Sequence, residues 1–286
     1  MTDTLKAACV QLNVGHNIQD NLKTTVELIK QAADQGAKLI ATPENTCFID
    51  SDKERKMKSA RPAETHPAIP VFADLAKELS VWLCIGSLKI KDEGLDRLAN
   101  RTHLFSPDGK LVATYDKIHL YDVDLDTGET WRESNEFRPG EKTVITPLNG
   151  DGVPDGFNLG LTICYDVRFA HLYRDLAKAG ANIFTVPAAF TVPTGKAHWE
   201  VMLRARAIEC GAFVLAPAQG GDHEGHRVTY GHSMMIGPWG EILAHLDHDE
   251  PGIITADLDL SAVTKARAAI QQLRHDRDYK SPNRNN

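Results

Sequence analysis

The feature that most limits the fold of this chain is a local pattern that occurs three times. A helix end marked by glycine is followed by a short apolar strand and then by a proline. The pattern is Gln35-Gly-Ala-Lys-Leu-Ile-Ala-Thr-Pro43, and it returns as Ala179-Gly-Ala-Asn-Ile-Phe-Thr-Val-Pro187 and, with one residue fewer, as Cys210-Gly-Ala-Phe-Val-Leu-Ala-Pro217. Glycine supplies the left-handed conformation that ends many helices, and proline stops a strand because it has no N–H to donate. Helices that alternate with short apolar strands predict an α/β fold.

A second pair of matching segments divides the chain into halves. Phe105-Ser-Pro-Asp-Gly-Lys-Leu-Val-Ala113 and Ile236-Gly-Pro-Trp-Gly-Glu-Ile-Leu-Ala244 both predict hairpins that turn at Pro-x-Gly. Each half then contains helix–strand units followed by a hairpin, which favours two pseudo-equivalent, helix-covered sheets around one core. With 286 residues, 42% of them hydrophobic, the chain can bury such a core. We expect a single domain over residues 1–275 and a polar tail over 276–286.

A cysteine lies where an apolar strand runs directly into a helix. Leu159-Gly-Leu-Thr-Ile-Cys-Tyr-Asp-Val-Arg-Phe169 is apolar up to Ile163, and apolar residues recur at helical spacing from Asp166 to a capping Gly180. A thiol at a helix start faces unpaired backbone N–H groups, whose partial positive charge favours thiolate and stabilises an oxyanion. The pattern predicts that Cys164 is a nucleophile, although free cysteine is also often a small buried hydrophobe.

Two other apolar segments deliver charged side chains near strand ends. Lys38-Leu-Ile-Ala-Thr-Pro-Glu44 stops at proline and presents Glu44, and Lys110-Leu-Val-Ala-Thr-Tyr-Asp-Lys-Ile-His-Leu120 places Lys117 in a stretch expected to enter the core. Charged residues are rarely buried unless they are paired or used. A thiol, a carboxylate and an ammonium are the nucleophile, proton shuttle and cation that an acyl-transfer site requires.

At these motifs the chain resembles the nitrilase superfamily of carbon–nitrogen hydrolases, over nearly its whole length. In that superfamily a glutamate follows a proline at a strand end, a lysine lies in a Tyr-x-Lys-x-His-Leu segment, and a cysteine precedes Tyr-Asp or Trp-Glu. Here these become Pro43-Glu44, Tyr115-Asp-Lys117-Ile-His-Leu120 and Cys164-Tyr165-Asp166, and a second family glutamate matches Glu133. The resemblance implies an α/β four-layer αββα sandwich with its site at the strand ends.

The resemblance and the chemistry of amides together imply a mechanism that needs no cofactor. Cys164 attacks the carbonyl, Glu44 takes the thiol proton and passes it to the leaving group, and water activated by Glu44 then cleaves the thioester. Lys117 and the Tyr165 backbone N–H hold the oxyanion, and Glu133 orients Lys117 and the substrate. We expect a dry pocket to raise the pKa of Glu44, with Lys117 opposing.

The resemblance implies an amide rather than a nitrile as substrate, because Tyr-Asp after Cys164, in place of Trp-Glu, looks like the amidase branches of the superfamily. The run from Thr191 to Glu209, with Tyr230-Gly-His-Ser-Met234, resembles deaminated-glutathione amidases, and omega-amidases acting on 2-oxo acid amides are the nearest rival. The expected reaction is hydrolysis of a small carboxylate-bearing amide to acid and ammonia. The other interpretations are hydrolysis of an N-carbamoyl amino acid and a non-catalytic binding scaffold.

Further residues are candidates for substrate binding besides Tyr165. Arg168, four residues after the nucleophile, is placed either to meet a substrate carboxylate, as the equivalent position does in some carbamoylase relatives, or to pair with an internal carboxylate. Thr194 and His198 either line the pocket or serve the start of their helix. The polar loop 121–140 is expected to fold over the pocket.

Charge and cysteine usage limit the partners and the compartment. With 32 basic and 39 acidic residues, a net charge of −7, the chain is not expected to bind nucleic acid or an anionic membrane. It has no run of eighteen apolar residues, and its first residues lead directly into a strand, so neither a membrane span nor a signal peptide is expected. Five cysteines at irregular spacing give no disulfide framework and suit a cytoplasmic location.

The remaining predictions concern metals and assembly. His223 and His226 are three residues apart in a glycine-rich loop, unlike the four-residue helical spacing of zinc proteases, so no metal site is predicted. The family resemblance implies a homo-oligomer, a dimer or higher. The helix after Cys164 is the candidate contact, and the tail 276–286 is expected to lie on a neighbouring subunit.

Overall fold

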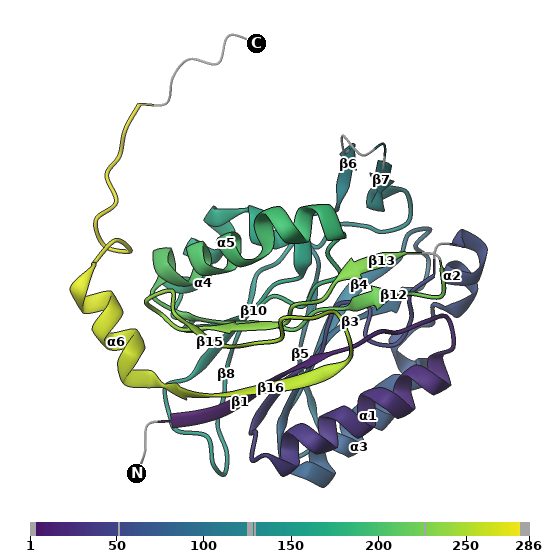
Figure 1. Ribbon diagram of the computed structural model, residues 1–286, viewed down its shortest axis with the longest axis horizontal. Coiled ribbons are helices and arrows are strands. Elements are labelled where there is room, and N and C mark those ends of the chain that lie inside the picture. The colour runs from purple at the N-terminus through teal and green to yellow at the C-terminus, as the bar shows by residue number, and fades with distance from the viewer. Residues whose placement is uncertain (1–3, 51, 125–127, 129, 226, 281–286) are drawn as a thin grey trace.

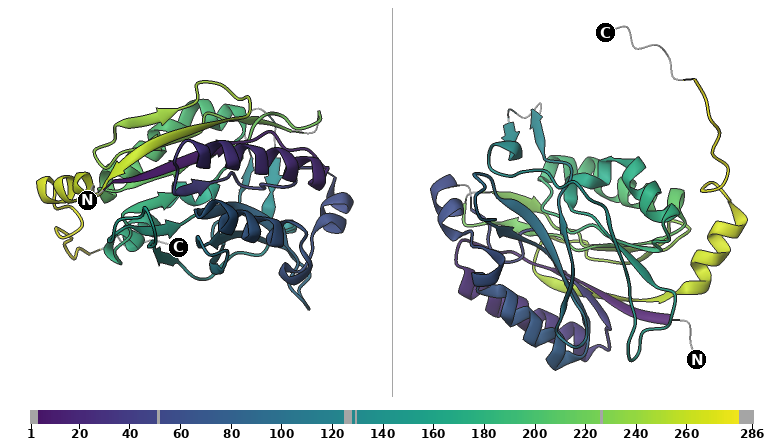
Figure 2. Two further views of the ribbon diagram at one scale, coloured as in Figure 1. Left: turned by 90° about the horizontal axis from the view of Figure 1, so that it is seen from below. Right: turned by 180° about the vertical axis from the view of Figure 1, so that it is seen from behind.

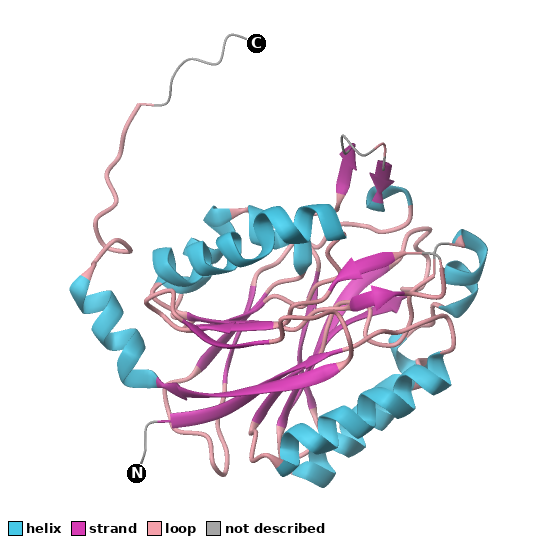
Figure 3. Cartoon of the chain, in the orientation of Figure 1, coloured by secondary structure: helices cyan, strands magenta, loops and turns pink. Residues whose placement is uncertain are grey.

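Two six-stranded sheets lie face to face, and helices cover the outer side of each, as Figures 1 and 3 show. The computed structural model describes residues 4–50, 52–124, 128, 130–225 and 227–280. The layer order is helix, sheet, sheet, helix. The first half of the chain and the late strand Gly252–Asp259 form one sheet, and the rest of the second half forms the other. This is the four-layer αββα sandwich predicted from the sequence.

The first sheet has the strand order β16-β1-β2-β3-β4-β5. Its strands are β1 (Thr4–Gln11), β2 (Leu39–Ala41), β3 (Trp82–Ile90), β4 (Ala99–Phe105), β5 (Leu111–Asp116) and β16 (Gly252–Asp259). The three strands β1, β2 and β3 are parallel, and the other neighbours pair antiparallel. Helices α1 (Ile18–Asp34) and α3 (Ala68–Leu79) connect the parallel strands and cover the outer face.

The second sheet repeats this pattern in the order β8-β9-β10-β11-β14-β15. Its strands are β8 (Val144–Pro147), β9 (Asn158–Leu161), β10 (Ile183–Thr185), β11 (Phe213–Ala216), β14 (Met234–Ile236) and β15 (Ile242–His245). Helices α4 (Ala170–Lys178) and α5 (Val192–Cys210) connect its parallel strands. Because the succession of antiparallel and parallel pairs is the same in both sheets, the predicted pseudo-equivalent halves are confirmed.

The glycine and proline signals act where the sequence predicts. Gly36, Gly180 and Gly211 follow α1, α4 and α5 with φ of 88°, 111° and 53°, a region that side chains disfavour. The two Pro-x-Gly turns join β4 to β5 and β14 to β15 as antiparallel hairpins. These local signals fix where each helix ends and each strand begins.

Alternation along the strands assigns each apolar side chain to one of two cores. In β1, Leu5, Ala7 and Cys9 belong to the core between the two sheets. Ala8 and Val10 belong instead to the core between the first sheet and helices α1 and α3. Successive side chains of a strand point to opposite faces, so one strand serves both layers, and all five residues are fully buried.

Short elements surround the sandwich. They are the helices α2 (Lys53–Ser59) and α6 (Leu260–Ala269), the 3₁₀ turns η1 (Ala63–Thr65), η2 (Glu133–Asn135) and η3 (Cys164–Arg168), the pair β6 (Asp122–Asp124) with β7 (Thr130–Arg132), and the pair β12 (Gly220–Asp222) with β13 (Val228–Tyr230). Within the described parts of the chain, no helix combines the length and the apolar character that a bilayer crossing requires.

The C-terminal tail leaves the sandwich after α6 and extends away from it, as Figure 2 shows for residues up to 280. Its first residue, Asp276, is held against α4 by ion pairs with Arg174 and Lys178. Residues 281–286 lie outside the described chain. The domain boundary at residue 275 and the contact of the tail with a neighbouring subunit stay predictions.

Candidate active site

Three chain segments from two sheets converge on one cavity. Glu44 follows β2 and Lys117 follows β5 in the first sheet, whereas Cys164 follows β9 in the second. All three side chains are buried and line a cavity of about 400 Å³, within the range of ligand pockets. The structure thus brings together the acid, the amine and the thiol that the sequence motifs single out.

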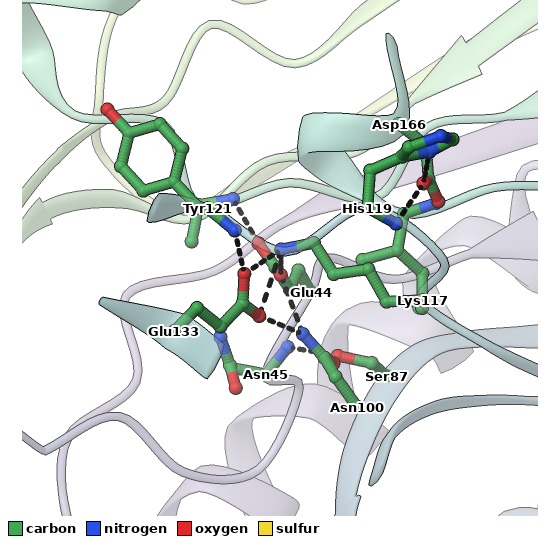
Figure 4. A network of polar contacts seen from close by, with 12 residues as sticks. Glu44, Asn45, Ser87, Asn100, Lys117, His119, Tyr121, Glu133 and Asp166 are labelled. Carbon is green, nitrogen blue, oxygen red and sulfur yellow. Dashed lines mark hydrogen bonds and ion pairs between the residues drawn. The ribbon is translucent and has the colours of Figure 1, made fainter. Parts of the chain in front are cut away.

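The Lys117 ammonium lies between two carboxylates, as Figure 4 shows. Its Nζ is 2.9 Å from Glu44 Oε1, and 2.9 and 3.1 Å from the two oxygens of Glu133. Burial alone lowers the pKa of Lys117, but the Glu133 and Glu44 carboxylates outweigh it and raise that pKa well above its usual value. Lys117 is therefore a permanent cation at the centre of the site.

A buried asparagine that the motifs do not reveal completes this network. Asn100 on β4 donates from Nδ2 to Glu44 Oε1 at 2.8 Å and lies 3.3 Å from Glu133 Oε1. The backbone N–H of Tyr121 donates to Glu133 Oε2 at 2.7 Å. Buried charges are tolerated only when such partners satisfy them. The one sequence signal for Asn100 is that asparagine is depleted from strands.

Glu44 is poised between the thiol and the ammonium. Its Oε2 accepts a hydrogen bond from the Ala189 backbone N–H at 3.1 Å, and the Cys164 thiol is hydrogen-bonded to the same carboxylate. Burial by itself raises the pKa of Glu44, but the charge of Lys117 and the hydrogen bonds outweigh it and hold this pKa below its usual value. The predicted rise is therefore wrong, because Lys117 and the hydrogen bonds to the carboxylate together exceed burial, the largest single effect on this pKa. Glu44 is ionised and able to accept a proton at neutral pH.

Cys164 lies on a strained turn, and its surroundings favour the thiol over the thiolate. Its φ is 49°, a conformation that is rare for residues other than glycine, and its N–H donates to the Pro187 carbonyl at 2.9 Å. Burial and the Glu44 carboxylate raise the pKa of Cys164, against the opposing effects of Lys117 and the Ala189 N–H. The predicted preference for thiolate is wrong for this reason. Attack must therefore be coupled to proton transfer to Glu44.

The segment after Cys164 is a 3₁₀ turn, η3, and the α-helix begins only at Ala170 rather than at the predicted Asp166. The cause is Asp166, whose carboxylate accepts from the Ile163 N–H at 2.9 Å and so tightens the turn. Among the described residues, no acceptor is found for the Tyr165 N–H, which immediately follows the thiol. This N–H and Lys117 are the available donors for an oxyanion.

Asp166 also ties the nucleophile turn to the lysine segment. Its fully buried carboxylate accepts from the Tyr115 hydroxyl at 2.7 Å, and from the His119 N–H and Nδ1 at 3.0 and 2.8 Å. Tyr115 and His119 flank Lys117 by two residues on either side. The Tyr-x-Lys-x-His and Cys-Tyr-Asp motifs are thus two halves of one hydrogen-bonded unit.

Replacing Asp166 with asparagine should lower both stability and turnover. The amide group would face donors at Tyr115, Ile163 and His119, and each donor left unpaired costs about 1–3 kcal/mol in unfolding free energy. Tyr115→Phe is the matched control, because it removes one of four hydrogen bonds and should cost about 1 kcal/mol. Denaturant unfolding and kcat measure the two effects. Equal stability and turnover in Asp166→Asn and the wild type would contradict this role.

Of the four residues predicted to bind substrate, the structure places three at the cavity. Tyr165, Arg168 and Thr194 line the cavity, and Thr194 also bonds Thr191 at the start of α5, so both roles suggested for it are present. His198 does not line this cavity. Its Nδ1 is 3.3 Å from the Arg168 guanidinium, and it borders a separate hollow beside α5.

Arg168 has no carboxylate partner in the described chain. Its guanidinium lies over the Tyr165 and Phe190 rings, 5.7 and 5.6 Å from their centroids. Of the two roles predicted for this residue, the pairing with an internal carboxylate is thereby not observed. An aromatic-walled cation that faces the cavity is free to meet a substrate carboxylate.

The loop 121–140 contributes one side of the cavity, as predicted, but it is not irregular throughout. It contains the β6–β7 pair and the turn η2, and Tyr121, Trp131 and Glu133 line the cavity. Residues 125–127 and 129 lie outside the described chain.

No metal site is predicted at the histidine loop. Of its two histidines, His223 has hydrogen-bond partners within the protein. His223 is buried, with Nδ1 2.7 Å from the Val14 carbonyl and Nε2 2.7 Å from Thr229 Oγ1. His226 lies outside the described residues. Within those residues, no three potential metal ligands gather at one point.

The cavity is positively charged although the chain is acidic. Its lining contains seven basic side chains and four acidic ones. The basic residues are Lys53, Lys56, Lys89, Lys117, Arg132, Arg168 and Arg227, and the acidic ones are Glu44, Asp50, Glu133 and Glu136. The net charge of the whole chain is −7, so this local excess of cations favours an anionic ligand.

Comparisons with known proteins agree with this arrangement. The carbon–nitrogen hydrolase family model matches residues 6–268. The chain is 40% identical over 272 residues to a deaminated glutathione amidase of Synechocystis, which covers 94% of this chain and 97% of the relative. The crystal structure of the Caenorhabditis elegans NitFhit protein superimposes with a TM-score of 0.86 at 31% identity over 96% of this chain and 66% of that one. Saccharomyces cerevisiae Nit3, a member of branch 10 of the nitrilase superfamily, gives a TM-score of 0.82 at 27% identity over 95% and 96% of the two chains.

Proposed function

The chain belongs to the carbon–nitrogen hydrolase family, whose members hydrolyse carbon–nitrogen bonds other than peptide bonds. We propose that it is a cysteine-dependent amidase for a small carboxylate-bearing substrate. The observation that carries this proposal is the buried contact of Glu44 with both Lys117 and Cys164 in one cavity. A thiol beside an ionised carboxylate, with an ammonium 2.9 Å from that carboxylate, suits acyl transfer.

The first half of the reaction forms a thioester. Cys164 Sγ forms a bond to the amide carbon while Glu44 takes the thiol proton. The negative charge on the carbonyl oxygen is stabilised by Lys117 and the Tyr165 N–H. The carbon–nitrogen bond then breaks, and Glu44 returns the proton to the leaving nitrogen, which departs as a neutral amine.

The second half releases the acid. Glu44 takes a proton from water, and the hydroxyl oxygen attacks the thioester carbon. The carbon–sulfur bond breaks, and the sulfur recovers its proton from Glu44. Glu133 fixes Lys117 by two contacts of 2.9 and 3.1 Å, so the cation needs no reorganisation during either half.

Deaminated glutathione is the substrate that the observations favour. The relative at 40% identity is named as an amidase of this compound, and the cation-rich cavity suits the two carboxylates of deaminated glutathione. Its scissile bond is a secondary amide, so the leaving amine is cysteinylglycine. The sequence-based expectation of acid and ammonia therefore applies only to a primary amide such as 2-oxoglutaramate.

A substrate panel tests the proposal. Deaminated glutathione, 2-oxoglutaramate, an N-carbamoyl amino acid and a simple nitrile should be compared by the release of acid and of amine or ammonia. We expect the highest kcat/KM with deaminated glutathione and none with the nitrile. Turnover of no amide at all would favour the scaffold interpretation, and preference for the N-carbamoyl compound would assign a carbamoylase.

The site itself argues against a scaffold. Lys117 and Glu44 are buried charges whose desolvation costs several kcal/mol each, and Glu133 beside them is only partly exposed. A binding pocket for an anion has no need of a carboxylate hydrogen-bonded to a thiol. The arrangement is explained by chemistry at Cys164.

A homo-oligomer, dimer or higher, is part of the proposal, and exposed apolar side chains support it. Val201 and Ile208 on α5 are 69% and 46% exposed, and Trp239 in the β14–β15 turn is 60% exposed. Exposed apolar side chains that lie together favour association. Sedimentation analysis of the purified chain measures the assembly.

The predicted cytoplasmic location is supported by the cysteines. All five, Cys9, Cys47, Cys84, Cys164 and Cys210, are free and buried. Cysteines kept as thiols suit a reducing compartment.

A further inference from the structure

The cavity holds a second group of cations that the proposed mechanism does not use. Arg227 precedes β13, and Lys89 lies in β3. Both line the cavity together with Glu44. Neither residue belongs to a motif in the sequence, and neither forms an ion pair with a carboxylate in the described chain.

Arg227 is held in place but incompletely satisfied. One of its terminal nitrogens donates to the Ala189 carbonyl, and its guanidinium lies over the Trp131 ring at 4.8 Å from the centroid. Among the described residues, its buried Nε has no hydrogen-bond partner. A buried donor without an acceptor is costly, so this guanidinium retains unused hydrogen-bonding capacity beside the cavity.

Lys89 is also fixed, with donor capacity to spare. Its buried Nζ donates to Asn45 Oδ1 at 2.7 Å and to the Phe48 carbonyl, and within the described part of the chain the third proton of the ammonium has no acceptor. Burial, together with the nearby charges of Lys56 and Arg227, lowers the pKa of Lys89 to about 7. Lys56 is paired with Glu136 at 2.6 Å, whereas neither Arg227 nor Lys89 has such a carboxylate partner among the described residues.

These two cations lie near Glu44, the residue that gives its proton to the leaving group in the proposed mechanism. Arg227 and Lys89 both interact electrostatically with Glu44, and Lys89 also donates a hydrogen bond to Asn45, the residue after Glu44. Glu44 gives its proton to the leaving nitrogen, so the amine portion of the substrate must lie beside Glu44. Arg168 contacts a different set of residues, Tyr165, Phe190 and His198, next to the nucleophile.

We propose that Arg227 and Lys89 form a subsite for a carboxylate on the amine portion of the substrate, while Arg168 serves the acyl portion. The enzyme then prefers secondary amides whose leaving group is an anionic amino acid or short peptide over primary amides and uncharged amines. This inference rests on the proposed amidase function. An Arg guanidinium matches a carboxylate with two parallel hydrogen bonds, and a carboxylate between two like charges relieves their repulsion.

A matched pair of substrates isolates this subsite. One is the 2-oxoglutaryl amide of cysteinylglycine, and the other is the same compound with its terminal carboxylate converted to a carboxamide. Both form the same acyl-enzyme, so they differ only in binding and acylation. We expect wild-type kcat/KM to favour the carboxylate by about 10- to 100-fold, because hydrogen bonds to charged groups are the stronger ones.

Two variants separate the portions of the substrate. Arg227→Gln should reduce the preference for the carboxylate by about tenfold or more. Arg168→Gln should lower kcat/KM for both substrates by the same factor, because their acyl portion is identical. The partition of the common acyl-enzyme between water and added hydroxylamine should be the same in Arg227→Gln and the wild type, whereas a general distortion of the site would alter it.

The outcomes distinguish this subsite from the amidase function. An unchanged substrate preference in Arg227→Gln overturns the subsite, even if both amides are hydrolysed. Should the wild type hydrolyse neither amide, the amidase proposal fails, and calorimetric binding of cysteinylglycine and of its carboxamide to Cys164→Ala then decides the subsite. Tighter binding of the carboxylate that is lost in Cys164→Ala/Arg227→Gln supports it, and equal binding of the two compounds overturns it.

Discussion

Cys164→Ala is expected to abolish amide hydrolysis, with a loss of kcat on the order of 10⁶-fold, as for other enzymes that lose a covalent nucleophile. Without the sulfur no thioester forms, and the remaining groups can only direct water at an unactivated amide. The cavity and the Lys117 network remain, because Glu44 keeps its contacts with Lys117 and the Ala189 N–H. The measurements are steady-state turnover and mass spectrometry of the acyl-enzyme, which should be absent.

Cys210→Ala is the matched control for this substitution. Cys210 is another free, buried cysteine, but it ends α5 and does not line the cavity. Its loss should reduce unfolding stability by about 1 kcal/mol, as for deletion of a small buried group, and leave kcat near the wild-type value. Persistent turnover in Cys164→Ala, with the other cysteines intact, would remove the mechanism.

Glu44→Gln is expected to lower kcat/KM by about 10²–10⁴-fold, the usual contribution of a positioned general base and acid. The amide cannot take the thiol proton, and the pKa of Cys164 is already raised, so little thiolate forms without help. Its NH₂ group would also face the donors Lys117 and Ala189, of which at least one loses its acceptor. A pre-steady-state measurement of amine release should show that acylation has become rate-limiting.

The direction of the pKa shift of Glu44 predicts how kcat/KM and stability change with pH. The pKa of Glu44 is below its usual value, so the carboxylate stays ionised, and protonation of Glu44 should not reduce kcat/KM until the pH passes below the ordinary carboxyl range. The same shift means that Glu44 stabilises the fold above its unfolded pKa, and that this contribution is lost as the pH falls through the lower folded value. Glu136→Gln, which lines the cavity but pairs with Lys56, should keep the wild-type acid limb. An unchanged limb in Glu44→Gln would contradict its assignment as the base.

The fold could be predicted to the extent that it is encoded by local signals. Glycines after helices and prolines after strands act through φ and a missing N–H, which depend little on the rest of the chain. The same signals occur before Pro43 and again before Pro187, so they also reveal that the two halves of the chain repeat one pattern. The turn after Cys164 differs from the predicted helix because its shape depends on the Asp166 carboxylate. The partners of that carboxylate, Tyr115 and His119, are distant in sequence.

The site could be predicted only where motifs name its residues. Asn100 and Arg227 contribute contacts that arise from the packing of the two sheets, and neither belongs to a motif that singles it out. The directions of the pKa shifts also depend on distances. A carboxylate in a dry cavity can shift either way, and the 2.9 Å contact between Glu44 and Lys117 decides the sign.

The division of the site between the two pseudo-equivalent halves has a consequence for how activity arises. The base and the ammonium come from one half and the sulfur from the other, so neither half alone holds the means to cleave an amide. Pro43 and Pro187 occupy matching places, yet glutamate follows the first and alanine the second. Each half has thus specialised, and catalytic competence emerges only when the sheets dock. Recovered turnover during refolding would report that final assembly step rather than the formation of either sheet.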